Sequence, residues 1–211
     1  MTDRNATGGG RPGESLRERK KRETRQRISN VATVMFREHG FEQVTVVEVA
    51  RAAGVSAMTV FNYFPRKEDL FLDRIPEAVE AFAGAVRDRA PGESPLAALR
   101  RLAFRFIDAR HPLGGMGENF VGFWPVVAES PALRARAREA VEEVERALAG
   151  ALAEAGLTEP ELAAALIVAA YRSVCVTSVG RQLAGEPFAG LVVDHRERMG
   201  AAFDALERMA L

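Results

Sequence analysis

Residues 57–64, which read Ala-Met-Thr-Val-Phe-Asn-Tyr-Phe, carry side chains that can recognise the edges of nucleic-acid bases. An Asn amide can pair with adenine, a Thr hydroxyl can bond a base or a phosphate, and Ala or Met can touch the methyl group of thymine. A short helix fits the major groove, which is about 12 Å wide. The residues expected on the outer face of such a helix are Ala57, Met58, Thr59, Asn62 and Tyr63. Their chemistry indicates contact with duplex DNA.

Three further residues are suited to phosphate groups. Thr45 and Ser56 stand at predicted helix N-termini, where free backbone N–H groups and the helix dipole attract anions. Lys67 follows the short helix and supplies another cation for a phosphate. These positions predict contacts that hold the DNA backbone while the helix reads the bases.

Caps and breakers in the sequence define the helices that position these residues. Apolar residues at helical spacing predict a first helix, which ends at Gly40. Thr45 and Glu48 fit a capping box at the start of a second helix, and Ser56 caps a third helix that Pro65 ends. The expected shared core consists of Val47, Val49, Ala50, Val55, Val60, Phe61 and Phe64. The pattern predicts a helix-turn-helix, although a small three-helix subdomain without DNA would share it.

The net charge of zero conceals an uneven distribution of charge along the chain. Residues 1–67 contain 13 basic and 7 acidic side chains, a net charge of +6, so the remainder carries −6. Residues 16–27 are the densest basic segment, with seven cations in twelve residues. A basic portion of this kind suits a polyanion, although a solvated basic tail has the same composition.

Several linked motifs over about residues 20–72 resemble the N-terminal signature of TetR-family transcriptional regulators. The motifs are Gly40-Phe41, Thr45-Val-Val-Glu-Val-Ala50, Ala53-Gly-Val-Ser56, Thr59-Val-Phe-Asn-Tyr-Phe64 and Lys67-Glu-Asp-Leu70. The resemblance implies an all-α homodimer in which three N-terminal helices bind an operator and a larger helical domain dimerises and binds an inducer. The positions it places against DNA are Thr45, Ala57, Met58, Thr59, Asn62, Tyr63 and Lys67.

Two residues depart from the family pattern. Phe61 replaces a tyrosine that many members carry, so no hydroxyl is present there to bond a phosphate. Arg66 replaces a small polar residue that would cap the fourth helix, and its guanidinium could contact a phosphate instead.

The domain organisation follows from composition and helix signals. We expect a disordered arm over residues 1–15, a helix-turn-helix DNA-binding domain over 16–67 and a ligand-binding and dimerisation domain over 68–211. Six helices are expected in the last domain, at about 68–89, 95–110, 118–128, 131–155, 162–183 and 191–209.

A ligand pocket requires apolar walls with a few polar groups. The candidate ligand-binding residues are Phe82, Phe104, Phe120, Phe123, Trp124, Tyr171, Arg110 and Cys175. Aromatic residues at helical spacing also form ordinary protein cores, and Cys175 fits the role of a small buried hydrophobe.

Apolar stripes on the last two helices predict a homodimer interface. Its candidate residues are Val176, Val179, Leu183, Met199, Phe203 and Leu206. The alternative is that both stripes pack inside one subunit.

The sequence contains no recognisable motif for an enzyme, a metal site or a cofactor. Three His and one Cys provide no metal-ligand spacing and no catalytic triad, and the lone Cys175 cannot form an intrachain disulfide. The longest strongly apolar run, residues 162–171, is short for a membrane span, and no signal peptide is visible. We therefore expect a cytoplasmic protein that does not enter a membrane.

These observations predict a repressor that binds a palindromic double-stranded DNA operator as a homodimer. An unknown small-molecule effector would shift the population toward a state that leaves the operator. The alternatives are an enzyme and an architectural protein that binds DNA without sequence preference.

Overall fold

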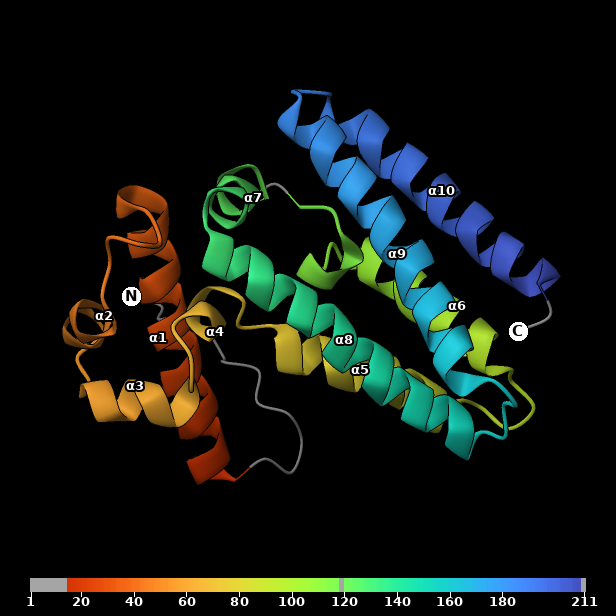
Figure 1. Cartoon of the computed structure of the whole chain (residues 1–211), viewed down its shortest axis with the longest axis horizontal. Coiled ribbons are helices and arrows are strands. Elements are labelled where there is room, and N and C mark those ends of the chain that lie inside the picture. The colour runs from red at the N-terminus through yellow and green to blue at the C-terminus, as the bar shows by residue number, and fades with distance from the viewer. Residues whose placement is uncertain (1–14, 118–119, 210–211) are drawn as a thin grey trace, which may run out of the picture. The chain divides into compact units, whose positions relative to one another are not determined.

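The computed structural model describes residues 15–117 and 120–209, and every regular element in these residues is helical (Figure 1). The all-α fold class is confirmed. The chain divides into two compact units, here called the N-terminal unit, up to Phe71, and the C-terminal unit, from Leu72. The disordered arm predicted for residues 1–15 lies, apart from Ser15, outside the described residues.

The N-terminal unit is built from helices whose first turns are capped by side chains. It contains α1 (Leu16–His39), α2 (Val46–Ala52), α3 (Ala57–Tyr63) and α4 (Glu68–Phe71). Thr45 and Glu48 form the predicted capping box, with the Thr45 N–H donating to Glu48 Oε2 at 2.7 Å. Ser56 caps α3 by accepting the Thr59 N–H at 3.0 Å. Gly54 has a φ of +66°, which lets the chain turn sharply between α2 and α3.

The core of the N-terminal unit differs from the predicted one at two positions. Val60 and Phe64 are buried as expected, whereas Val47 and Phe61 are 56% and 47% exposed. The reason is geometric, because each of these helices makes only two turns and buries one side. Phe61 lies about 100° around α3 from the buried Val60, and Val47 lies about 200° around α2 from the buried Val49. Val47 and Phe61 were therefore wrongly assigned to the core.

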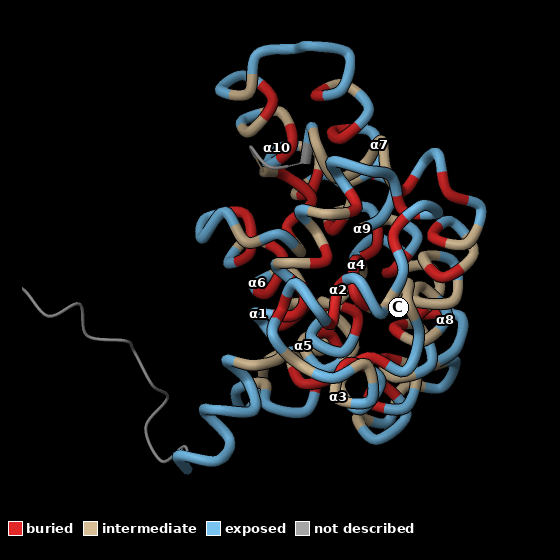
Figure 2. The backbone as a smooth tube through the Cα atoms, turned by 90° about the vertical axis from the view of Figure 1, so that its left-hand side faces the viewer, coloured by how far each residue is buried: buried red, intermediate tan, exposed pale blue. Residues whose placement is uncertain are grey.

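The C-terminal unit is a helical bundle. It contains α5 (Ile75–Arg87), α6 (Pro95–Asp108), the short 3-10 turn η1 (Pro112–Gly114), α7 (Phe120–Glu129), α8 (Pro131–Glu154), α9 (Pro160–Leu183) and α10 (Phe188–Arg208). Neighbouring helices pack in the order α5, α8, α9 and α10, and α6 contacts both α5 and α10 (Figure 1). Buried and exposed positions alternate around the helices (Figure 2), and the buried ones form one apolar core.

The helix predicted for residues 68–89 is broken in two. The short α4 ends at Phe71, and α5 begins at Ile75. Pro76, near the start of α5, has no N–H to give to a carbonyl one turn earlier, so a helix running through it from α4 would lose a backbone hydrogen bond, whereas in the first turn of a new helix that N–H is not needed. The prediction of one continuous helix over residues 68–89 was therefore wrong, although Pro76 was visible in the sequence as a helix-breaking residue.

Helix α9 is more apolar than the sequence pattern suggested. Within the described residues it is the one helix long and apolar enough to cross a membrane by length and composition. The same property is common in core helices of soluble bundles, and here Ala164, Ile167 and Val168 of α9 are buried in the C-terminal core. Packing therefore accounts for much of its apolar character.

Candidate nucleic-acid interface

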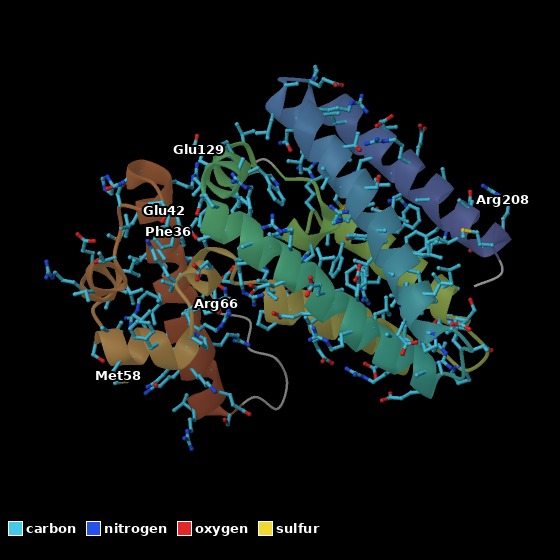
Figure 3. All side chains as sticks on the ribbon, in the orientation of Figure 1. Phe36, Glu42, Met58, Arg66, Glu129 and Arg208 are labelled. Atoms are coloured by element: carbon cyan, nitrogen blue, oxygen red, sulfur yellow. The ribbon has the colours of Figure 1, made fainter. Side chains whose placement is uncertain are left out.

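One face of α3 presents three side chains to solvent. Met58, Phe61 and Asn62 are all exposed, and their spacing of i, i+3 and i+4 places them on the same side of the helix. The opposite side carries Val60, which is fully buried. Figure 3 shows Met58 on the outer side of α3. We call Met58, Phe61 and Asn62 the α3 face. Of the other residues predicted on this outer surface, Ala57, Thr59 and Tyr63 are half-buried.

The two predicted phosphate-binding N-termini are well formed and exposed. The Thr45 hydroxyl donates to Glu48 Oε2 at 2.7 Å, and the Ser56 and Thr59 hydroxyls lie 2.8 Å apart. The backbone and side-chain hydrogen bonds from Thr45 hold the pKa of Glu48 below its ordinary value. Glu48 is therefore ionised at neutral pH, and its charge would repel a phosphate placed beside the α2 N-terminus.

Lys67, a predicted phosphate contact, also makes contacts within the N-terminal unit. Its Nζ donates to the backbone carbonyl of Phe41 at 2.5 Å and lies 4.3 Å from the centre of the Phe41 ring. Burial lowers the pKa of this amine. Lys67 therefore joins the end of α1 to the start of α4, and its contact with a phosphate stays a prediction.

The N-terminal half of α1 is a basic helical surface. Residues 16–23 are all exposed, and the first buried side chain of α1 is Ile28. The Arg25 guanidinium lies 4.6 Å from the centre of the Phe64 ring, directly after α3. This contact fixes the basic half of α1 beside the C-terminal end of α3, so cations and the α3 face belong to one rigid unit.

Comparison with known proteins identifies the family of this chain. The sequence model described as "Bacterial regulatory proteins, tetR family" matches residues 28–73, the segment that contains α2, α3 and α4. The HTH-type transcriptional regulator TcmR of Streptomyces glaucescens is 32% identical over 179 residues, which cover 82% of this chain and 79% of TcmR. This chain belongs to the TetR family. Members of the family are DNA-binding transcriptional regulators and not enzymes, so the enzyme alternative is excluded.

Solved structures of the TetR family share the fold. A TetR-family regulator from Streptomyces coelicolor A3 superposes with a TM-score of 0.54 at 24% identity, covering 95% of this chain and 99% of that one. NalD, the secondary repressor of the MexAB-OprM multidrug efflux pump in Pseudomonas aeruginosa, superposes with a TM-score of 0.53 at 18% identity, covering 88% and 96%. Both likenesses extend over the C-terminal unit as well as the N-terminal one.

In this TetR-family regulator the predicted ligand-binding residues do not form a single cluster. Phe82 and Tyr171 pack edge to face with ring centres 5.1 Å apart, and Phe123 and Trp124 do so at 5.4 Å. Phe104 instead lies against α10, where the Arg196 guanidinium is 4.7 Å from its ring centre. Arg110 is exposed, and the side chain of Phe120 lies outside the described part of the chain. Four of the predicted residues, Phe82, Phe104, Tyr171 and Cys175, lie in or against the C-terminal core, and Phe82 and Tyr171 are in direct contact.

The loop after α6 is anchored to α9. The Tyr171 hydroxyl donates to the Leu113 carbonyl at 2.5 Å, and Gln182 Nε2 donates to the Gly117 carbonyl at 2.9 Å. Between them, the side chain of Cys175 packs directly against Gly115, whose φ is +76°. Burial raises the pKa of the Cys175 thiol to about 12, so this cysteine is an inert packing group at neutral pH.

A buried polar cluster between α9 and α10 was not predicted. Ser178 Oγ lies 2.7 Å from His195 Nδ1 and accepts a hydrogen bond from Arg198 Nη2 at 2.9 Å. His195 is fully buried, and burial lowers its pKa, so the imidazole is neutral at neutral pH. The available signal was the helical spacing of Tyr171, Cys175, Ser178 and Gln182, which places four polar or weakly polar residues on one stripe of an apolar helix.

The predicted dimer residues divide into two groups. Val176 and Leu183 are exposed on α9, whereas Val179, Met199, Phe203 and Leu206 are buried within the protomer. Met199, Phe203 and Leu206 of α10 pack into the core of their own chain, and Val179 of α9 is also buried, so in this structure a single chain covers these four side chains. The helical spacing of apolar residues on α10 indicated that these side chains are buried. It could not indicate whether they are covered by their own chain or by a second copy.

Proposed function

We propose that this chain is a cytoplasmic repressor that binds a palindromic operator as a homodimer and is released when a small molecule binds its C-terminal unit. The α3 face carries the proposal: three side chains on the outer side of a short helix, held by a buried core behind it. At about 1.5 Å per residue α3 is about 10 Å long, which suits entry into the major groove. Occupying an operator in this way would block transcription from an overlapping promoter.

A second copy of the chain is proposed to cover the outer face of α9. A helix of seven residues reads few base pairs, so two copies related by twofold symmetry would be needed to read a palindrome. Exposed residues at helical spacing run along α9 on the side away from its own core. They are Leu162, Ala169, Ser173, Val176, Gly180 and Leu183, and we call them the α9 stripe. Its small residues allow a partner helix to approach closely.

The same contacts suggest how a ligand would act on DNA binding. A ligand beside Phe82 and Tyr171 would disturb the bond from Tyr171 to the loop after α6. In that loop His111 Nε2 lies 3.1 Å from Glu77 Oε1 of α5, and α5 follows the N-terminal unit after three residues. Ligand binding would thereby favour a different position of α5 and shift the population away from the operator-bound state.

Operator binding is tested by gel shift with the full chain. We expect a duplex from the promoter region of its own gene to bind more tightly than a random duplex of equal length. The Asn62→Ala variant should lose about 1–3 kcal/mol of this discrimination, while Arg138→Ala, on an exposed part of α8, should retain it. Equal affinity for both duplexes at every salt concentration would instead identify an architectural binder.

Dimerisation is tested by sedimentation velocity. Val176→Arg places a charge in the α9 stripe and should convert the dimer to a monomer. Val121→Arg is the matched control, because Val121 is equally exposed but lies on α7. Dissociation of both variants, or of neither, would contradict the proposed interface.

Ligand release is tested by screening small molecules for a rise in Tm of the full chain. A compound that raises Tm should also release the operator duplex. Tyr171→Phe, which lacks the hydroxyl that bonds Leu113, should bind the operator normally but release it less completely. A stabilising compound with no effect on operator binding would refute the proposed release.

A further inference from the structure

Large apolar side chains are exposed where α3 would meet DNA. Met58 is 70% exposed and Phe61 is 47% exposed, and the two lie one turn apart on the α3 face. An exposed apolar pair on a folded surface commonly marks a contact site. Phe61 carries no hydroxyl, so it cannot donate a hydrogen bond to a phosphate. Any contact that its side chain makes with a partner is therefore apolar.

The charge around this pair indicates the kind of partner that covers it. Residues 1–67 carry a net charge of +6, and the basic half of α1 is fixed beside α3 through Arg25 and Phe64. A polyanion is therefore the complementary surface, and an apolar protein surface would gain nothing from these cations. Within duplex DNA, the apolar group displayed on a base edge in the major groove is the C5-methyl of thymine.

The third residue of the α3 face points to the same base pair. Asn62 can form two hydrogen bonds with the N6 and N7 atoms of adenine, whose partner is thymine. Met58 and Phe61 are separated along the helix by about 4.5 Å, close to the spacing of about 3.4 Å between successive bases. Two apolar side chains and one amide on one face therefore match neighbouring A·T pairs.

We propose that each operator half-site is read mainly through thymine methyl groups, with Met58 and Phe61 each covering one methyl and Asn62 bonding a neighbouring adenine. This rests on the proposed function. It identifies Met58 and Phe61 as specificity residues and A·T pairs as the class of base pair that they select.

The test replaces each thymine of a bound operator duplex, one at a time, by deoxyuridine, which lacks only the methyl group. Losing one buried methyl should weaken binding of the wild-type chain about fourfold at two positions of each half-site. The Met58→Ala variant should become insensitive to the substitution at one of these positions, and Phe61→Ala at the other. The control is Val34→Ala, which truncates an exposed apolar residue of α1 and should keep the wild-type response at both.

The outcomes separate this proposal from the one on which it depends. Specific operator binding that is indifferent to every deoxyuridine would overturn methyl recognition and leave the repressor proposal intact. A Met58→Ala variant that is weakened equally on thymine and deoxyuridine duplexes would also overturn it. Failure of the wild-type chain to prefer any duplex would overturn both.

Discussion

The packing of Cys175 against Gly115 makes one substitution unusually informative. Gly115 has a φ of +76°, and a Cβ added there would overlap the Cys175 sulfur and lie 2.7 Å from its Cβ. The left-handed backbone costs an Ala about 1–2 kcal/mol, and overpacking costs about 1–3 kcal/mol more. Gly115→Ala should therefore lower the free energy of unfolding of the C-terminal unit by about 2–5 kcal/mol.

Urea unfolding followed by tryptophan fluorescence measures this destabilisation, because the single tryptophan, Trp124, lies in the C-terminal unit. Gly150→Ala is the matched control: Gly150 is an exposed helical residue with open space around its Cα, so Ala there should stabilise by about 1 kcal/mol. Adding Cys175→Ala to Gly115→Ala should restore part of the stability by removing the sulfur. If Gly115→Ala unfolds at the same urea concentration as the wild type, the loop is not held in this packing.

Three other variants test the titratable side chains described above. Replacing Lys20 and Lys21 by Ala should make the plot of log affinity for DNA against log salt concentration less steep, by about 0.9 for each phosphate that is no longer neutralised. Arg138→Ala should leave this slope unchanged. Fluorescence anisotropy at several salt concentrations measures both. Lys67→Met should lower the stability of the N-terminal unit by about 1 kcal/mol in thermal unfolding and leave the salt dependence of DNA binding unchanged. Burial lowers the pKa of His195 in the folded chain, so below the ordinary His pKa of about 6.5 the unfolded chain binds more protons than the folded one. The free energy of unfolding should therefore fall as the pH drops below about 6.5. His195→Gln should lose part of this pH dependence in urea titrations at several pH values.

Local signals predicted much of the fold. The Thr45–Glu48 capping box and the Ser56 cap occur as expected, because each depends on residues only three apart and needs no information about distant packing. The break before α5 followed from Pro76 and could have been predicted from the same kind of signal.

The candidate site was less predictable, because burial depends on contacts between distant elements. The residue types of the α3 face were recognisable, yet Phe61 was placed inside because an aromatic residue in a short helix fits either side. The bond from Lys67 to the Phe41 carbonyl was not predicted, because nothing nearby in sequence reveals a partner 26 residues away. The polar stripe that contains Ser178 could be read from the spacing along α9, but its pairing with His195 of α10 could not, because the two residues lie on different helices.

The apolar character of α9 links association to stability. Fewer than half of the residues in its most apolar window are buried within one chain, and the residues of the α9 stripe are exposed. In the proposed dimer a second copy removes this surface from water, so the folded state gains free energy by mass action as the protein becomes more concentrated. The midpoint of thermal unfolding would then rise with protein concentration, and a cell with few copies would hold this regulator in a less stable form than a cell with many.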